Sequence, residues 1–142
     1  MTTTPLHDAV RASNVSAVEA LLTSGSQVNV VDKLKRTPLH LASWAGDADM
    51  VQLLLRFKAN PLALAQDAYT ALHFAAQKDT GAMTCEVLAK KSAKLLSLKI
   101  SKGGKTALHL AVVKGNTEVV KKLLELGADP MTKTGGNQTC LV

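Results

Sequence analysis

The stretch Thr37-Pro38-Leu39-His40-Leu41-Ala42 predicts the start of a helix. Threonine is a favoured N-cap because its hydroxyl accepts a hydrogen bond from an unpaired backbone N–H, and proline fits the first helical position, where no N–H is needed. Leu39 and Ala42 then begin an apolar stripe with helical spacing. Versions of this stretch begin at intervals of 33, 33, 36 and 33 residues, at Thr4, Thr37, Thr70, Thr106 and, in degenerate form, Thr139. A period of that length indicates stacked supersecondary units.

The composition fits a small helical protein. The 142 residues are 46% hydrophobic and 20% charged, as in globular proteins, but only 3% are aromatic. The core therefore has to be built from Leu, Val and Ala, which suits thin layers of packed helices better than a β-sandwich or barrel. No apolar run approaches the roughly 18 residues that cross a bilayer, and residues 1–4 are not the start of a signal segment. We expect an intracellular protein, cytoplasmic or nuclear, without a membrane span.

The period divides this single domain into repeats 1–32, 33–65, 66–101 and 102–133, with a fifth beginning at 134–142. Each complete repeat is expected to hold two helices, ended by glycines such as Gly46 and Gly115. The first repeat has Asp8 where the others have a buried apolar residue (Leu41, Phe74 and Leu110), which suits an end repeat whose outer face meets water. The chain either continues in a longer protein or stops with a hairpin that caps the fourth repeat.

The third repeat is longer than the others. Its register predicts Val87 and Leu88 as core residues of the second helix, so its three extra residues are expected after Leu88. We place them within 93–105, where an insertion lengthens a surface loop at little thermodynamic cost.

The 33-residue period, the stretch from Thr37 to Ala42 and the sequence Gly127-Ala128-Asp129-Pro130 resemble the ankyrin repeat family. The resemblance covers essentially the whole chain. It implies an all-α ankyrin repeat solenoid, in which helix-turn-helix units joined by β-hairpin fingers stack and recognise other proteins on a concave face. It also implies that His7, His40, His73 and His109 hydrogen-bond around the helix starts and the neighbouring turns. Asp79 and Lys91 replace the glycines of the pattern, so the turns of the third repeat are expected to differ.

The sequence predicts a protein that is not an enzyme and that has no cofactor or metal site. The four histidines lie on neighbouring repeats, and helices pack about 8–10 Å apart, whereas zinc needs its ligands at about 2 Å. The segment Gly103-Gly104-Lys105-Thr106 lacks the first glycine of a phosphate-binding loop, since position 99 is lysine. Cys85 is interpreted as a reduced thiol that serves as a small hydrophobic residue in a helix. It is placed on the surface of the second helix, with no histidine beside it in the repeat.

The predicted binding face combines the finger residues before each capping threonine with the last turn of each first helix, positions that the resemblance marks as exposed and variable. Its residues are Arg11, Lys33, Leu34, Arg36, Trp44, Gln66, Asp67, Tyr69, Gln77, Lys78, Lys102, Lys105 and Lys114. They include the chain's only Trp and only Tyr, and seven cations against one acid, which suits an interface hot spot with a charged rim. We predict a monomer that binds an acidic or phosphorylated protein or peptide. The alternative is that Trp44 merely packs against the next finger.

Other functions stay open at this point. The chain also fits a regulatory or targeting segment of a larger enzyme, such as a kinase or a ubiquitin ligase. The lysines between 90 and 105 alternate with apolar residues, which suggests a membrane surface or a calmodulin-like partner, although the same leucines fit the core of the third repeat with the lysines as a solvated rim. Nucleic-acid binding is disfavoured because two scattered aromatic residues make a poor stacking platform.

Overall fold

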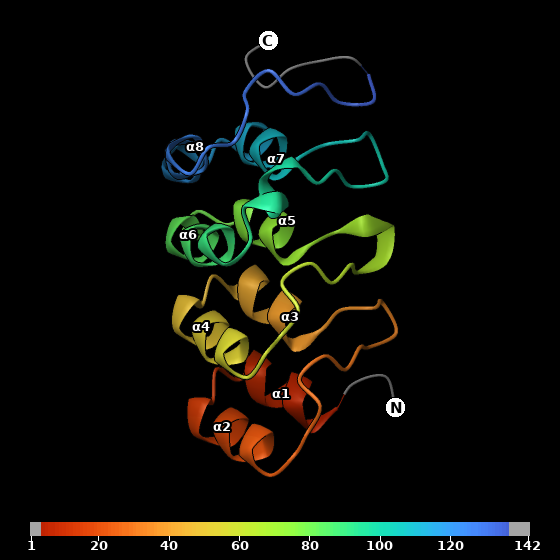
Figure 1. The fold of residues 1–142 in the computed structure, drawn as a ribbon, viewed down its shortest axis with the longest axis vertical. Coiled ribbons are helices and arrows are strands. Elements are labelled where there is room, and N and C mark those ends of the chain that lie inside the picture. The colour runs from red at the N-terminus through yellow and green to blue at the C-terminus, as the bar shows by residue number, and fades with distance from the viewer. Residues whose placement is uncertain (1–3, 137–142) are drawn as a thin grey trace.

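Helix pairs stacked in chain order make up the computed structural model of the chain, which describes residues 4–136 (Figure 1). The first helix of each pair lies in the middle of the stack, the second on one side, and the intervening fingers on the other side. This arrangement confirms the predicted all-α fold. The elements are α1 (Pro5–Arg11), α2 (Val15–Thr23), α3 (Pro38–Ala45), α4 (Ala48–Arg56), η1 (Gln66–Ala68), α5 (Ala71–Ala76), α6 (Ala82–Lys91), η2 (Ala93–Ser97), α7 (Ala107–Lys114) and α8 (Thr117–Glu125), where η marks a 3-10 helix.

Each first helix begins with the same reciprocal cap. The hydroxyl of Thr37 accepts from the backbone N–H of His40 (3.3 Å), and the backbone N–H of Thr37 donates to the Nδ1 atom of His40 (2.9 Å). Together these bonds satisfy two donors that a helix start leaves unpaired. The same capping box joins Thr4 to His7, Thr70 to His73 and Thr106 to His109. The predicted threonine N-caps are therefore confirmed within the described residues, whereas Thr139 lies outside them.

The second nitrogen of the imidazole links the helix start to the chain segment that leads into the next repeat. Nε2 of His40 lies 3.0 Å from the carbonyl oxygen of Ala63 and 3.2 Å from that of Tyr69. Because Nδ1 already accepts a hydrogen bond, Nε2 carries the proton and donates it, so the ring is neutral. Equivalent links join His7 to the Arg36 carbonyl (2.8 Å) and His73 to the Leu98 carbonyl (3.0 Å). The structural role that the resemblance implied is thus confirmed for these three histidines.

The fingers are not confirmed as β-hairpins, since the structure assigns no strand within residues 4–136. The ends of each finger are joined by a backbone bond, Asp32 N–H to Arg36 O, Ala65 N–H to Tyr69 O and Ile100 N–H to Lys105 O, and the first two fingers have a further turn bond, Lys35 N–H to Asp32 O and Ala68 N–H to Ala65 O. Further bonds run between successive fingers, from Gln66 N–H to Leu34 O, Ser101 N–H to Asp67 O and Gly135 N–H to Gly103 O. The fingers therefore turn on isolated bonds and stack on one another, without the continuous ladder of a sheet.

The register of the third repeat is shifted by one residue from the predicted one. Helix α6 begins twelve residues after Thr70, whereas the other second helices begin eleven residues after their threonines. The additional residue lies in the turn 77–81, so the expectation that all extra residues follow Leu88 is wrong. As a result Ala89 joins Leu88 in the core, and Val87, which was predicted to be a core residue, is only half-buried.

The connection after α6 is more than the predicted surface loop. It contains η2, which buries Leu95 completely, and Ile100 is also buried at its end. The lysines of the same segment are exposed at positions 90, 91, 94, 99 and 102. These positions support the reading of the apolar residues as core and of the lysines as a solvated rim.

The hydroxyl of Thr84 in α6 is buried and has no hydrogen-bond partner among the described residues. Leaving a hydroxyl unpaired in a core costs about 1–3 kcal/mol, and valine has nearly the same shape without the polar atom. We therefore expect Thr84→Val to raise the free energy of unfolding by about 1 kcal/mol in urea titrations. Thr117→Val, at an exposed position of α8, is the control. A loss of stability in Thr84→Val would contradict this account of the site.

Candidate protein-binding face

Phe74 of α5 is the centre of an aromatic cluster that spans two repeats. Its ring lies 5.3 Å from Tyr69 in a stacked arrangement, and 5.9 Å from Trp44 and 5.4 Å from His40 in edge-to-face arrangements. Trp44 comes from the last turn of α3, and Tyr69 from the finger that precedes α5. Phe74 was predicted to be a buried scaffold residue, but it is partly exposed. The sequence signal that sets position 74 apart is its aromatic side chain, because the equivalent positions carry Leu41 and Leu110.

Trp44 contacts Phe74, on the next first helix, and still keeps 43% of its surface exposed. The ammonium of Lys78 lies 4.6 Å from the centre of the Trp44 ring, within the range of a cation–π interaction. The indole therefore combines a fixed position with an accessible surface. Both properties are typical of the residues that dominate binding energy in interfaces.

Two adjoining hollows flank the cluster. One of about 260 Å³ is lined by Arg36, His40, Leu41, Trp44 and Phe74. The other, of about 200 Å³, is lined by Leu34, Arg36, Ala65, Gln66, Asp67, Tyr69 and Phe74. Because Arg36 and Phe74 belong to both, the hollows form one continuous surface, which together with Lys78 we call the aromatic face.

The aromatic face gathers seven of the thirteen predicted site residues, namely Leu34, Arg36, Trp44, Gln66, Asp67, Tyr69 and Lys78. The remaining six line neither hollow, and Gln77 instead donates a hydrogen bond to the carbonyl of His73 (3.1 Å). Those six are Arg11, Lys33, Gln77, Lys102, Lys105 and Lys114. The geometry therefore concentrates the candidate site on the second and third repeats.

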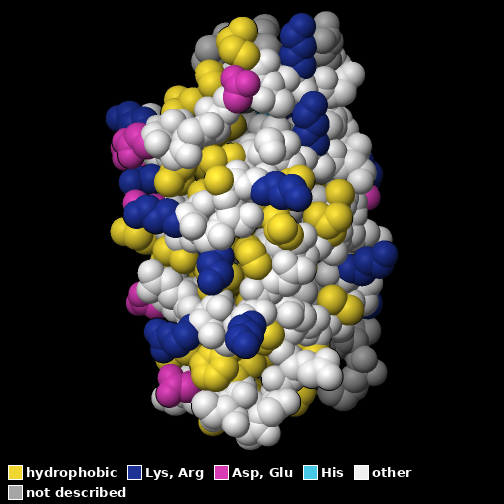
Figure 2. Space-filling model, in the orientation of Figure 1, with side chains coloured by type: hydrophobic (Ala, Val, Ile, Leu, Met, Phe, Trp, Pro, Cys, Tyr) yellow, Lys and Arg dark blue, Asp and Glu magenta, His cyan; other side chains and the backbone are white. Residues whose placement is uncertain are grey.

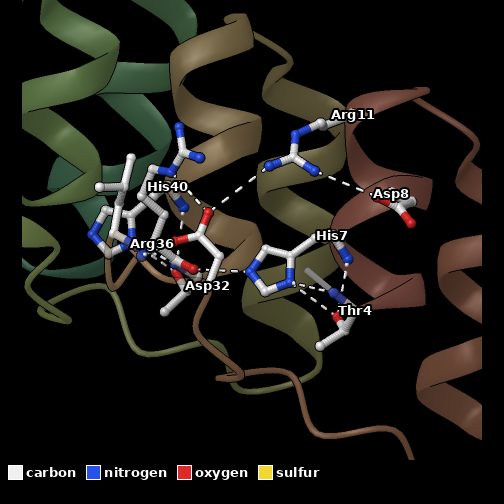
Figure 3. Close-up of polar contacts among 9 residues, drawn as sticks. Thr4, His7, Asp8, Arg11, Asp32, Arg36 and His40 are labelled. Atoms are coloured by element: carbon white, nitrogen blue, oxygen red, sulfur yellow. Dashed lines mark hydrogen bonds and ion pairs between the residues drawn. The ribbon is translucent and has the colours of Figure 1, made fainter. Parts of the chain in front are cut away.

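Asp32 offsets part of the positive charge that was expected on this surface (Figure 3). Only 1% of its side chain is exposed, and its Oδ2 lies 2.9 Å from Arg36 Nε and 3.8 Å from an Arg11 nitrogen. Its Oδ1 accepts from the backbone N–H groups of Leu34 and Arg36. Burial alone would raise the pKa of Asp32, but these hydrogen bonds and the guanidinium of Arg36 outweigh it and hold the pKa below its usual 3.8. Asp32 therefore stays ionised at neutral pH.

The prediction of seven cations against Asp67 alone overstates the positive charge of this surface, because it leaves out Asp32. Arg11 and Arg36 share the carboxylate of Asp32, and Lys102 lies 3.8 Å from Asp67. Asp32 stands four residues before Arg36 and opens the finger turn, a spacing that could have drawn attention to the pair. The cations that keep their charge available are lysines, among them Lys33, Lys78, Lys105 and Lys114, which form no ion pair within the described residues.

Removing the carboxylate of Asp32 should destabilise the finger formed by residues 32–36. We expect Asp32→Ala to lower the free energy of unfolding by about 2 kcal/mol, because two backbone donors and the Arg36 guanidinium lose their acceptor. Both arginines reach solvent, which keeps the loss below that of a fully buried ion pair. Chemical denaturation would measure it, with Asp79→Ala at an exposed position as the control. Equal stabilities of the two variants would contradict a structural role for Asp32.

Cys85 is fully buried, so its interpretation as a small apolar residue of a helix is confirmed, whereas its placement on the helix surface is wrong. Burial raises its pKa to about 12, so the reactive thiolate is scarce at neutral pH. Within residues 4–136 no group of three or more His, Cys, Asp or Glu side chains is placed to hold a metal ion. Nor does that part of the chain contain a helix with the length and apolar character needed to cross a membrane.

Comparison with known proteins finds ankyrin repeats in both halves of the chain. Residues 6–55 match a sequence family described as ankyrin repeats (many copies), and residues 58–134 match one described as ankyrin repeats (3 copies). The B-cell lymphoma 3 protein homolog of Mus musculus is 38% identical over 131 residues, which are 89% of this chain and 29% of that protein. The mitochondrial disaggregase of Bos taurus is 34% identical over 139 residues, 96% of this chain and 20% of that protein. The nuclear factor NF-kappa-B p105 subunit of Gallus gallus is 32% identical over 124 residues, which are 85% of this chain and 12% of that protein. This chain thus spans less than a third of the length of each relative.

Proposed function

The chain belongs to the ankyrin repeat family, whose repeats are non-catalytic protein-interaction modules, and from this premise we propose that its aromatic face binds an acidic or phosphorylated segment of another protein. The observation that carries the proposal is the exposed indole of Trp44, fixed against Phe74 beside two hollows. An apolar or aromatic side chain of the partner would occupy the hollow between Trp44, Leu41 and Phe74. Such a contact buries apolar surface at a rigid position, where it contributes most to affinity.

The charge around the aromatic face supports a negatively charged partner. Lys78 beside Trp44, together with Lys33 in the preceding finger, has no carboxylate partner among the described residues. Lysines at such positions speed the encounter with an acidic segment more than they tighten the final complex. We therefore assign recognition of charge to the lysines and the anchoring contact to Trp44, Tyr69 and Phe74.

A second candidate function is that of a regulatory or targeting segment within a larger enzyme. It is favoured by the 34% identity to the palmitoyltransferase AKR1 of Lachancea kluyveri, over 96% of this chain but 19% of that protein. Both functions use the repeats to bind a protein surface, and they differ in whether that surface belongs to the same chain. We also propose a monomer in the cytoplasm or nucleus, and the nuclear factor among the relatives supports the nuclear location alone.

The test compares acidic peptides with matched controls. A set of synthetic twelve-residue peptides would carry acidic residues or phosphoserine around one Leu, Phe or Trp, and a paired set would carry lysine in place of each acid. Fluorescence anisotropy is expected to show binding of the acidic set and at least a tenfold loss of affinity in Trp44→Ala, about 1.4 kcal/mol. Leu124→Ala on α8, where 40% of the side chain is exposed, is the matched control and should bind normally. Equal binding of the lysine peptides, or equal affinities of the two variants, would refute the proposal.

A further inference from the structure

A larger hollow, of about 460 Å³, is lined by residues of α4 and α6. These two helices lie on the side of the stack away from the fingers (Figure 1). The hollow shares no residue with the aromatic face, so its properties are independent of the function proposed for that face. Its lining residues are Gln52, Leu55, Arg56, Met83, Glu86, Val87, Lys90 and Lys91. The volume is in the range of protein sites that accept small ligands or a few side chains.

The floor of this hollow is apolar and accessible. Met83 is 58% exposed, and Val87 is half-buried because the extra residue in the turn 77–81 shifts the register of α6 and leaves Ala89 in the core position. Leu55 of α4 supplies the opposite wall. Methionine adapts to different partner shapes because its side chain is flexible and polarizable. Covering these side chains would remove apolar surface from water, which favours binding.

The rim of the hollow is positively charged. Arg56, Lys90 and Lys91 are cationic, and the one carboxylate among the lining residues, Glu86, is shared between Lys90 (3.3 Å) and Lys122 (3.8 Å). Arg56 and Lys91 form no ion pair within the described part of the chain. Figure 2 shows hydrophobic side chains over the second helices, with Lys and Arg side chains and several Asp and Glu side chains among them.

We propose that the α4–α6 hollow is a second docking site, which binds an acidic protein segment carrying at least one apolar side chain. The apolar side chain enters between Met83, Val87 and Leu55, and the acidic residues beside it pair with Arg56 and Lys91. An anionic membrane would satisfy the lysines, but the combination of a hollow with an apolar floor favours a segment that inserts a side chain. With both sites occupied, the chain would hold two protein segments on opposite sides of one stack.

The test uses a library of random twelve-residue peptides displayed on phage and selected on the full chain carrying Trp44→Ala. This background disables the aromatic face, so the outcome does not depend on the function proposed for it. Enriched peptides are synthesised and their affinity is measured for the same background with Arg56→Glu and Lys91→Glu added. The control adds Lys133→Glu, an exposed lysine outside the hollow. Circular dichroism checks that all variants are folded, and the Met83 methyl resonance reports contact with the peptide.

We expect the enriched peptides to combine acidic residues with Leu, Phe or Met, and to shift the Met83 methyl resonance. Their affinity should fall at least tenfold with the Arg56 and Lys91 reversals and stay within twofold with Lys133→Glu. Peptides without acidic residues, or peptides that bind the reversed variant unchanged, would overturn the proposal. So would vesicles rich in phosphatidylserine that bind the chain through Arg56 and Lys91 while no peptide shifts the Met83 resonance.

Discussion

Between pH 7 and pH 4 the chain is expected to lose about 6 kcal/mol of its free energy of unfolding, since one pKa unit corresponds to about 1.4 kcal/mol. Burial lowers the pKa of His40 and of His73 to about 4, whereas in the unfolded chain both titrate near 6.5. Hydrogen bonds to backbone carbonyls raise the pKa of each histidine, but less than burial lowers it. In this pH window the unfolded state binds more protons than the folded state, so stability falls as the pH falls. Each histidine accounts for about 3 kcal/mol by pH 4.

The physical reason is that protonation breaks the capping bond at the start of the helix. A proton on Nδ1 removes the acceptor for the backbone N–H of the capping threonine and places a charge in a buried site. Urea titrations at pH 7, 6, 5 and 4 would measure the loss, and His40→Gln/His73→Gln is the control. This double variant should be less stable at pH 7 but should show a flatter pH dependence above pH 4. Asp32, whose pKa lies below 3.8, adds its own loss only at still lower pH. An unchanged slope in the double variant would assign the acid sensitivity to other groups.

Replacing Gly81 with alanine should be the most damaging single glycine substitution that the described structure identifies. An alanine Cβ at this position would lie 2.0 Å from the carbonyl oxygen of Ala75 and 3.1 Å from that of Lys78. Both are backbone atoms, so the turn between α5 and α6 has to move. We expect Gly81→Ala to lower the free energy of unfolding by about 3 kcal/mol, the upper end of what overpacking costs.

Gly115→Ala separates steric overlap from backbone strain. Gly115 ends α7 in the left-handed conformation (φ 73°), and an added Cβ would meet no atom within 4 Å. Its replacement therefore costs only the strain of an L-residue in that region, about 1 kcal/mol. Gly81 has an ordinary helical backbone (φ −82°), so its effect would come from the overlap alone. Thermal and urea denaturation of both variants would show the difference, and a Gly81→Ala loss no larger than that of Gly115→Ala would contradict the assignment.

The elements that the sequence predicted well are those with strong local signals. Thr37 and Pro38 predict a helix start without any tertiary information. The threonine N-cap recurs at Thr4, Thr70 and Thr106. The sequence also predicted that Trp44 and Tyr69 lie near one surface, because the repeat period fixes which positions lie beside each helix start. Whether these residues bind a partner stays a prediction.

The features that the sequence did not predict depend on how distant segments meet. The exposure of Phe74 is set by Trp44 and Tyr69, which come from the preceding helix and finger. Asp32 becomes a buried counter-charge only when its finger folds back toward Arg36 and Arg11 approaches from α1. The shift of α6 arises in the turn 77–81, where Asp79 replaces the glycine that would have fixed the turn length. A register carried across that turn without the extra residue therefore predicts Val87 in the core, where the structure has Ala89 instead.

The neutral state of the histidines that join the repeats has a practical consequence. Hydrogen bonds from a neutral imidazole to buried carbonyls are insensitive to ions in solution, whereas exposed lysines such as Lys33 and Lys91 are screened over about 10 Å at 0.1 M salt. High ionic strength should thus slow the encounter with the proposed acidic partner while the stack of repeats stays intact. Added salt would then lower the association rate constant without unfolding the chain, and dialysis would restore it.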